Sequence, residues 1–435
     1  MFLGSRSLAI FSQPCGRLYG VLSQTVTVVG IGADGWAGLP PRSKTAIEQA
    51  GVIVGGVRQL ALLPDAVAGR RIALPSPLLP GLSELAAAHA GSALVVLASG
   101  DPMFYGIGST LVAILGAAQV TVLPHLSSVS LAASRLGWPL DDVDVVSLVG
   151  RPRELLHPVL QPGRRVFALT AETTAAADIR ALLEARGFGR SQVTVLADLG
   201  GWQEVVAPAD GRPHSRLAII AIDCKLDDGA SSAAGSGAGG GAGAGPLPRV
   251  PGLPDDAFEH DGQITKREIR AVALAALAPV PGQLLWDVGA GSGSVGIEWM
   301  RIHPASRTIA VEPRADRRDR IARNAAALGV PGLVVVPGSA PDALSGLPRP
   351  DAVFVGGGVT GDGVVTACLD ALAPGGRLVA NAVTIEGHSV LAGWWRSVGG
   401  TLTRLGLERA DKLGGFTAWR PALPVVQWSV RKEGS

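Results

Sequence analysis

Residues 284–293 could bind a nucleotide-like ligand, because they join a predicted strand, an acid and a run of small residues: Leu284-Leu285-Trp286-Asp287-Val288-Gly289-Ala290-Gly291-Ser292-Gly293. Glycines lack a Cβ, so the backbone of such a turn can pass close to a ligand. Glu312 lies 23 residues after Gly289, at the end of the next predicted strand. A carboxylate there can accept hydrogen bonds from both hydroxyls of a ribose.

The turn alone leaves the ligand open. Its glycines follow G-x-G-x-G, whereas dinucleotide sites follow G-x-G-x-x-G, although Gly296 leaves some ambiguity. Asp287 before the turn is typical of Rossmann-like proteins that bind S-adenosylmethionine (SAM). SAM has no pyrophosphate for the helix N-terminus to bind. The pattern favours SAM, and a dinucleotide site or a plain tight turn are the alternatives.

A second candidate site lies in the N-terminal half, where three predicted strands are each followed by small or turn-forming residues. These segments are Gly30-Ile31-Gly32-Ala33-Asp34-Gly35, Ser99-Gly100-Asp101-Pro102-Met103-Phe104-Tyr105-Gly106 and His125-Leu126-Ser127-Ser128. Strand ends of this kind can form one crevice at the carboxyl edge of a sheet. Each segment alone could equally be a structural turn.

Alternating strands and helices position both candidate sites. In the N-terminal half we expect strands at 25–29, 52–54, 94–98, 120–123, 143–146, 165–169, 193–196 and 217–222. Helical stretches separate many of them, which favours a largely parallel sheet. In the C-terminal half, strands at 284–288, 308–311, 333–336, 352–355 and 377–380 alternate with helices at 266–277, 294–303 and 315–328. This run predicts an α/β doubly wound sheet, with Thr265 capping its first helix.

One segment divides the chain. Residues 227–246, DDGASSAAGSGAGGGAGAGP, contain no aromatic or branched aliphatic residue, so they cannot bury enough apolar area to offset their ordering entropy. We therefore predict a flexible linker between a domain at 25–226 and a domain at 247–435. Residues 1–24 are predicted to be an extension outside both domains, because Arg6, Gln13 and Pro14 interrupt any signal-like apolar stretch.

Composition narrows the classes of function. A net charge of +2 with 17% charged residues gives no basic footprint for nucleic acid. The apolar stretches are shorter than the roughly 20 residues of a spanning helix, so no membrane association is expected. Cys15, Cys224 and Cys368 are too scattered for a metal site or a disulfide framework. A cytoplasmic enzyme without a metal is the expectation.

The motifs of the two halves together resemble a known family. In the N-terminal half, the motifs VGIGADGW from Val29, GDPMFYGIG from Gly100 and PHLSSVS from Pro124 resemble those of the tetrapyrrole methylases. In the C-terminal half, the matching motifs are HDGQITKRE from His260, the glycine turn, PGGRLVANA from Pro374 and GGFT from Gly414. In this order the halves resemble the decarboxylating precorrin-6Y C(5,15)-methyltransferases of cobalamin biosynthesis.

The resemblance implies a fold, a reaction and a cofactor. The N-terminal half would have the tetrapyrrole methylase fold of two α/β subdomains, and the C-terminal half a Rossmann-like methyltransferase fold. Two SAM sites per chain would methylate precorrin-6Y at ring carbons 5 and 15, and the acetate on ring C would be lost as CO2, giving precorrin-8X. The family also suggests a homo-oligomer. A methyltransferase with two modules that acts on RNA or another small molecule, or a chain in which one half only binds SAM, are the alternatives.

Carried over residue by residue, the resemblance implies the following SAM contacts: Gly32, Ala33, Asp101, Phe104, Ser127 and Ser128 in the first site, and Thr265, Asp287, Gly289, Ala290, Gly291, Ser292, Gly293, Glu312 and Ala340 in the second. Two positions depart from the wider patterns. Ala33 stands where many tetrapyrrole methylases have proline, and Ser339 stands where many Rossmann-like methyltransferases place an acid on the adenine.

Few residues suggest acid–base chemistry. Asn381 and Glu386 follow a predicted strand and are our candidates for catalytic residues facing the reacting ring, with helix capping as the alternative. The substrate's carboxylates require positive contacts. Arg267, Arg270 and Arg377 are candidates, whereas the arginines of 314–323 more simply form the solvated face of a helix. His125 and His260 are more simply structural hydrogen-bonding residues than catalysts.

Overall fold

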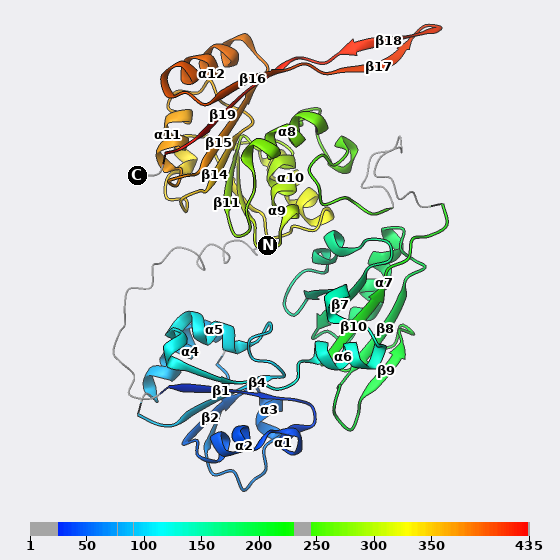
Figure 1. Cartoon of the computed structure of the whole chain (residues 1–435), viewed down its shortest axis with the longest axis vertical. Coiled ribbons are helices and arrows are strands. Elements are labelled where there is room, and N and C mark those ends of the chain that lie inside the picture. The colour runs from blue at the N-terminus through cyan, green and yellow to red at the C-terminus, as the bar shows by residue number, and fades with distance from the viewer. Residues whose placement is uncertain (1–24, 76, 90, 230–244, 434–435) are drawn as a thin grey trace.

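The computed structural model describes residues 25–75, 77–89, 91–229 and 245–433, so the predicted extension at 1–24 lies outside the described residues. These residues build three α/β units in chain order, each around its own sheet (Figure 1). A further two-stranded sheet stands apart from them. Among the described helices, none combines the length and the apolar character that crossing a bilayer requires.

The first sheet is parallel throughout and has the order β3-β2-β4-β1-β5. Its strands are β1 (Val26–Ile31), β2 (Val52–Gly55), β3 (Arg70–Ala73), β4 (Leu94–Ser99) and β5 (Val120–Leu123). Helices α1 (Gly35–Gly38), α2 (Pro41–Glu48) and α3 (Val57–Ala61) lie below the sheet in Figure 1, and α4 (Leu78–Ala88) and α5 (Ile107–Leu115) lie above it. Helices on both faces explain why β1, β2 and β4 are almost continuously apolar.

The second sheet is mainly antiparallel, with the order β6-β7-β10-β8-β9. Its strands are β6 (Val143–Ser147), β7 (Arg165–Thr170), β8 (Gln192–Ala197), β9 (Val205–Pro208) and β10 (Ala218–Asp223), flanked by α6 (Ser128–Leu136) and α7 (Ala175–Ala185). Only β6 and β7 run parallel. The expectation of one largely parallel sheet is therefore wrong for this unit, because β7 and β8 both pair antiparallel with β10, and β9 pairs antiparallel with β8.

The third sheet is doubly wound and has the order β13-β12-β11-β14-β15-β19-β16. Its parallel strands are β11 (Leu284–Val288), β12 (Arg307–Glu312), β13 (Val334–Pro337), β14 (Ala352–Val355) and β15 (Arg377–Ala382). Strand β19 (Val425–Arg431) runs antiparallel between β15 and β16 (Thr401–Leu405). Strands β16 and β19 were not predicted from the sequence.

Helices cover both faces of the third sheet. Helices α8 (Arg267–Leu277), α9 (Ser294–Ile302) and α10 (Ala315–Ala327) pack on one face, and α11 (Val364–Ala371) and α12 (Ile385–Val398) on the other. The predicted cap at Thr265 is wrong: α8 begins one residue later than expected, with Lys266 at the N-cap position and no side-chain cap. A buried ion pair holds α8 instead, because Arg270 Nε donates to Glu298 Oε1 of α9 at 2.5 Å.

A long hairpin projects from this domain. Strands β17 (Glu408–Leu413) and β18 (Phe416–Pro421) pair only with each other and extend away from the sheet in Figure 1. The hairpin exposes Phe416 at 82% and Trp419 at 70% of their surfaces. The GGFT motif at Gly414, one of the stretches that carry the family resemblance, lies at the turn of this hairpin.

The ends of the predicted linker are held, while its centre, 230–244, lies outside the described residues. Asp227 accepts the Arg190 N–H at 2.8 Å. At the other end, the Leu247 carbonyl accepts hydrogen bonds from Gln161 in the second unit (3.0 Å) and from Arg301 in α9 (3.3 Å). Residue 247 therefore bridges the two predicted domains.

Candidate active sites

Three loops meet at the carboxyl edge of the first sheet. A Cβ built on Gly30 would lie 2.0 Å from the Gly100 carbonyl oxygen and 2.7 Å from the His125 nitrogen. The backbone closes this contact, because Gly100 N–H donates to Ile31 O at 3.1 Å and His125 N–H donates to Gly100 O at 3.3 Å. Gly30 is therefore required for the loops after β1, β4 and β5 to touch.

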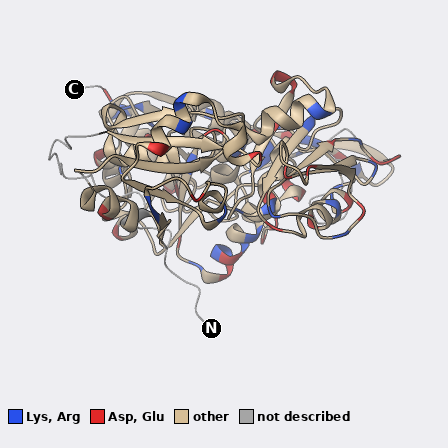
Figure 2. Cartoon of the chain, turned by 90° about the horizontal axis from the view of Figure 1, so that it is seen from below, with Lys and Arg blue, Asp and Glu red and all other residues tan. Residues whose placement is uncertain are grey.

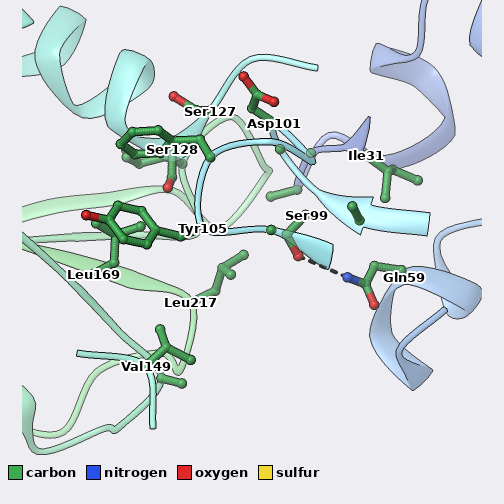
Figure 3. A pocket seen from close by; sticks show the side chains of 18 of the residues that line it. Ile31, Gln59, Ser99, Asp101, Tyr105, Ser127, Ser128, Val149, Leu169 and Leu217 are labelled. Carbon is green, nitrogen blue, oxygen red and sulfur yellow. Dashed lines mark hydrogen bonds between the residues drawn. The ribbon is translucent and has the colours of Figure 1, made fainter. Parts of the chain in front are cut away.

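These loops form one wall of a cavity of about 590 Å³, and the second sheet supplies the other wall (Figure 3). Ile31, Ser99 and Asp101 come from the first unit, and Val149, Leu169 and Leu217 come from the second. All six residues predicted for the first SAM site line this cavity, namely Gly32, Ala33, Asp101, Phe104, Ser127 and Ser128.

Local hydrogen bonds shape this lining. Asp101 Oδ1 accepts the Met103 N–H at 2.9 Å, which folds the loop after β4. Ser127 is the N-cap of α6, and its Oγ accepts the Ser130 N–H at 3.1 Å. The His125 ring contacts the loop after β1, since its Nε2 lies 3.2 Å from the Gly38 carbonyl oxygen and 3.6 Å from the Asp34 carboxylate. These contacts are compatible with the structural role predicted for His125, which stays a prediction.

The cavity also contains polar residues that the sequence analysis missed. Ser99 Oγ accepts hydrogen bonds from Arg58 Nη2 and Gln59 Nε2, both at 3.0 Å, and Figure 3 shows the second bond. Arg216 lines the opposite wall, just before β10. Arg58 could have been found, because it follows Gly55-Gly56 at the end of a predicted strand; nothing in the sequence marks Arg216.

The second candidate site lies at the glycine turn between β11 and α9. Gly289 has φ +67°, and a Cβ there would lie 2.7 Å from the Gly357 carbonyl oxygen in the loop after β14. Gly291 and Gly293 also have positive φ, which favours glycine. The turn therefore brings the loops after β11 and β14 into contact.

Glu312 is aimed at this turn from the end of β12. It is buried, its Oε2 accepts the Gly291 N–H at 2.9 Å and its Oε1 accepts the Arg314 N–H at 3.1 Å. A carboxylate oxygen can accept more than one hydrogen bond, so both oxygens keep capacity for ligand hydroxyls. This placement suits the ribose contact predicted for Glu312.

Asp287 lies one layer behind the turn. Its Oδ2 accepts the Gly296 N–H at 2.9 Å in the first turn of α9, and the residue is 1% exposed. Burial raises the pKa of this carboxyl to about 7; the Gly296 hydrogen bond opposes the rise and the charge of Glu312 adds to it. Asp287 therefore holds the helix against the strand end.

The arginines of α10 fasten a loop over the turn. Arg317 Nε donates to Asp261 at 2.9 Å, and Arg323 donates to both oxygens of Glu259 at 2.7 and 2.8 Å. Loop 259–265 thereby reaches the turn, and Gln263 O lies 3.6 Å from where a Gly291 Cβ would be. The interpretation of this run as a merely solvated helix face is wrong, since its charges pair with the loop.

The remaining residues predicted for the second site are spread along this edge. The Thr265 carbonyl accepts a hydrogen bond from Arg270 Nη1 at 2.5 Å. Ser292 is buried in the turn itself, two residues after Ala290. Ala340 follows β13 and packs on the core beneath α11. The contacts of Arg270 and Arg377 are internal, because Arg270 pairs with Glu298 and Arg377 donates to the Ala278 carbonyl at 2.6 Å.

Asn381 and Glu386 differ in their surroundings. Asn381 is the last but one residue of β15, one residue beyond the pair that Ala380 makes with Val355 of β14. Its Oδ1 accepts from Gln427 Nε2 at 3.0 Å, while its buried Nδ2 has no partner among the described residues. Glu386 is exposed in the first turn of α12. Gln427, which orients the Asn381 amide, was not predicted.

Two family models match the chain. Residues 25–211 match the Tetrapyrrole (Corrin/Porphyrin) Methylases, and residues 256–432 match the Precorrin methyltransferase domain. A precorrin-6Y C(5,15)-methyltransferase (decarboxylating) from a Sinorhizobium species is 47% identical over 95% of this chain and 97% of that protein. The chain belongs to the precorrin-6Y C(5,15)-methyltransferase (decarboxylating) family.

Two further members of this family are similar to the chain. The Mycobacterium tuberculosis enzyme of the same name is 45% identical over 94% of this chain and 100% of its own length. The solved C-terminal domain of the precorrin-6Y C5,15-methyltransferase from Rhodobacter capsulatus is 46% identical, covers 43% of this chain and 100% of that chain, and has a TM-score of 0.41.

Methyltransferases of this family depend on SAM, and the residues of both sites fit it. The N-terminal cavity of about 590 Å³ is mainly apolar with few polar groups, as is usual for cofactor sites. In the C-terminal site, glycines leave the backbone bare at the turn, and Glu312 keeps free lone pairs beside it. Each site thus combines glycines, which let a ligand approach the backbone, with a nearby carboxylate, Asp101 in the first site and Glu312 in the second.

The raised pKa of Asp287 predicts a pH-dependent stability. Its folded pKa of about 7 lies above the ordinary 3.8, so its contribution to the free energy of unfolding is full below about pH 4 and is lost as the pH rises through 7. Asp287→Asn retains an acceptor for Gly296 N–H and cannot ionise. We expect the variant to gain over the wild type by a few kcal/mol between pH 5 and pH 8, measured by denaturant unfolding without ligand.

Asp316→Asn is the matched control, because Asp316 is exposed on α10 and pairs with Arg314. The control should not become more stable relative to the wild type as the pH rises. Parallel pH profiles for Asp287→Asn and the wild type would contradict the account of Asp287.

Proposed function

We propose that this chain methylates precorrin-6Y at ring carbons 5 and 15 and removes the ring C acetate as CO2, giving precorrin-8X in the cytoplasm. The observation that carries the proposal is the presence, in one chain, of two close glycine contacts between loops at the carboxyl edges of two different sheets, the first of which borders a cavity. Relatives with this full name match the chain over both halves.

The proposal assigns one SAM site to each predicted domain. The domain at 25–226 methylates carbon 5 with SAM in the cavity between its two sheets. The domain at 247–435 methylates carbon 15 and decarboxylates, with SAM at the glycine turn. The linker at 227–246 joins them. The contacts to SAM are those carried over from the family to Gly32, Ala33, Asp101, Phe104, Ser127 and Ser128, and to Thr265, Asp287, Gly289, Ala290, Gly291, Ser292, Gly293, Glu312 and Ala340.

SAM, once bound, supplies a methyl group on an electrophilic sulfonium. The chain's own residues then need to position the two reactants and exclude water from them, and they need not activate the methyl group. Phe104, Leu169 and Leu217 give the first cavity apolar walls that exclude water from the reacting carbon. Fixing two reactants at near-attack distance can supply much of the rate enhancement. Catalysis by positioning suits sites whose described residues include no obvious pair of nucleophile and base.

Asn381 is our candidate for a catalytic residue in the second domain. Its buried, unpartnered Nδ2 can donate to an oxygen of the substrate, and Gln427 keeps the amide in that orientation. Glu386 is the second candidate, at the exposed start of α12 near the same edge. Both would assist the decarboxylation or the methylation at carbon 15.

A methyltransferase acting on RNA or on another small molecule is the competing function. RNA binding would be favoured by a continuous basic surface. Over the described residues visible in Figure 2, Lys and Arg alternate with Asp and Glu, in keeping with the near-neutral sequence. No specific observation favours this alternative.

Product analysis tests the proposal. The full chain is incubated with precorrin-6Y and SAM, and the product is measured by mass spectrometry. We expect the gain of two methyl groups and the loss of one CO2. Glu312→Gln should leave a product with one added methyl group and no decarboxylation, because the amide NH2 cannot accept and the second site alone loses one of the two acceptor oxygens of Glu312.

Asp316→Ala serves as the control for Glu312→Gln, since Asp316 lies on α10 and is exposed. It should give the wild-type product. Full double methylation by Glu312→Gln would refute the second site, and methylation of bulk RNA in place of precorrin-6Y would favour the competing function.

We further propose that the enzyme is a homo-oligomer whose copies associate through the β17–β18 hairpin. Leu413, Phe416 and Trp419 are exposed there, and large apolar side chains gathered on one projection commonly mark an association surface. Light scattering of the purified chain should give a multiple of 44.3 kDa, and Phe416→Ser with Trp419→Ser should give the mass of a single chain. A monomeric wild type would refute the proposal.

A further inference from the structure

The N-terminal cavity contains an excess of positive charge. Among the residues that line it, the charged ones are Arg58, Asp101 and Arg216. Asp101 lies at the loop after β4, within the segment proposed to hold SAM. The two guanidinium groups come from different units: Arg58 from α3 beside the first sheet, and Arg216 from the residues that lead into β10 of the second.

The helix that bears Arg58 is fixed at its end, and Arg58 itself is oriented by a neutral partner. Arg71 fixes the end of α3, because it donates to the Leu60 carbonyl at 3.2 Å and to the Pro64 carbonyl at 2.6 Å. At its start, Arg58 Nη2 donates to Ser99 Oγ at 3.0 Å. A hydroxyl orients a guanidinium without neutralising it, so the charge of Arg58 stays available to a ligand.

Arg58 is an exposed residue whose guanidinium is only partly desolvated by the cavity walls. Burial lowers its pKa, and the charge of Asp198 only partly offsets this effect. The described residues place no carboxylate within ion-pair distance of Arg58. An anion in the cavity would therefore meet no competing carboxylate at this guanidinium.

Arg216 is exposed and is also without an ion pair or hydrogen bond among the residues the structure describes. Its neighbour Leu217 is seen in Figure 3 on the wall opposite Gln59 and Ser99. Arg212, four residues earlier, instead pairs with Asp210 at 3.4 Å and does not line the cavity. The two arginines of this loop therefore differ in what they can offer a ligand.

We propose that Arg58 and Arg216 together bind two peripheral carboxylates of the tetrapyrrole, one from each side of the cavity, and so select a polycarboxylate macrocycle for the first methylation. This inference rests on the function proposed above. Guanidinium groups suit the role, because they bind carboxylates with two parallel hydrogen bonds and stay charged. An apolar cavity strengthens such bonds relative to water.

SAM itself is a poor match for this pair of arginines. It carries one carboxylate against an ammonium and a sulfonium, so its net charge is positive. Two guanidinium groups on opposite walls need two anionic groups to balance them, and SAM offers a single carboxylate. A tetrapyrrole with several carboxylate side chains provides these groups on one rigid ring.

Steady-state kinetics of the full chain test the site, with Arg58→Gln and Arg216→Gln as variants and Arg212→Gln as the matched control. We expect each variant to raise the KM for precorrin-6Y by roughly 10-fold or more, the scale of a lost hydrogen bond to a charged group. kcat and the Kd for S-adenosylhomocysteine should stay within about 2-fold of the wild type. Arg58→Lys should restore part of the KM, since it keeps the charge but loses the two-point geometry.

Binding of uroporphyrin, a polycarboxylate tetrapyrrole, gives a readout that does not need turnover. Both Gln variants should weaken it, and its methyl ester should bind wild type and variants alike. Unchanged KM and uroporphyrin affinity in both variants would overturn the inference, as would an equal loss of S-adenosylhomocysteine binding. Failure of the wild type to turn over precorrin-6Y would instead refute the proposed function.

Discussion

Close contact between backbone loops at the carboxyl edge of a sheet is the constraint on which both sites depend. No Cβ fits at Gly30, which faces the Gly100 carbonyl, or at Gly289, which faces Gly357. Where parallel strands end side by side, loops that touch in this way leave a crevice bordered by main-chain groups. The rest of each unit serves to hold these edges: helices on both faces of the sheet, the Arg270–Glu298 pair under the second site, and the arginines of α10 on its covering loop.

The two candidate sites differ in which part of the chain covers them. In the N-terminal half, a second sheet supplies the opposite wall, so the cavity is assembled from two units. In the C-terminal half, loop 259–265 lies over the turn and is fixed by ion pairs with Arg317 and Arg323. The second site thus depends more on electrostatic contacts near the surface, which salt weakens.

Much of this could be predicted from the sequence, because local patterns determine strand–turn–helix units. Strands β5, β11 and β14 have the predicted bounds, and the six residues chosen for the first site line one cavity. The antiparallel pairing around β10 and the insertion of β19 between β15 and β16 were missed, because pairing between distant strands leaves no local pattern. Arg216 and Gln427 were missed for the same reason: each matters through what it faces in space.

The proposed function requires two SAM sites in one chain. Titration calorimetry of the full chain with S-adenosylhomocysteine, which binds without reacting, tests it directly. The account predicts two equivalents bound per wild-type chain and one equivalent for Glu312→Gln. A single equivalent for the wild type, or two full-affinity equivalents for Glu312→Gln, would contradict it.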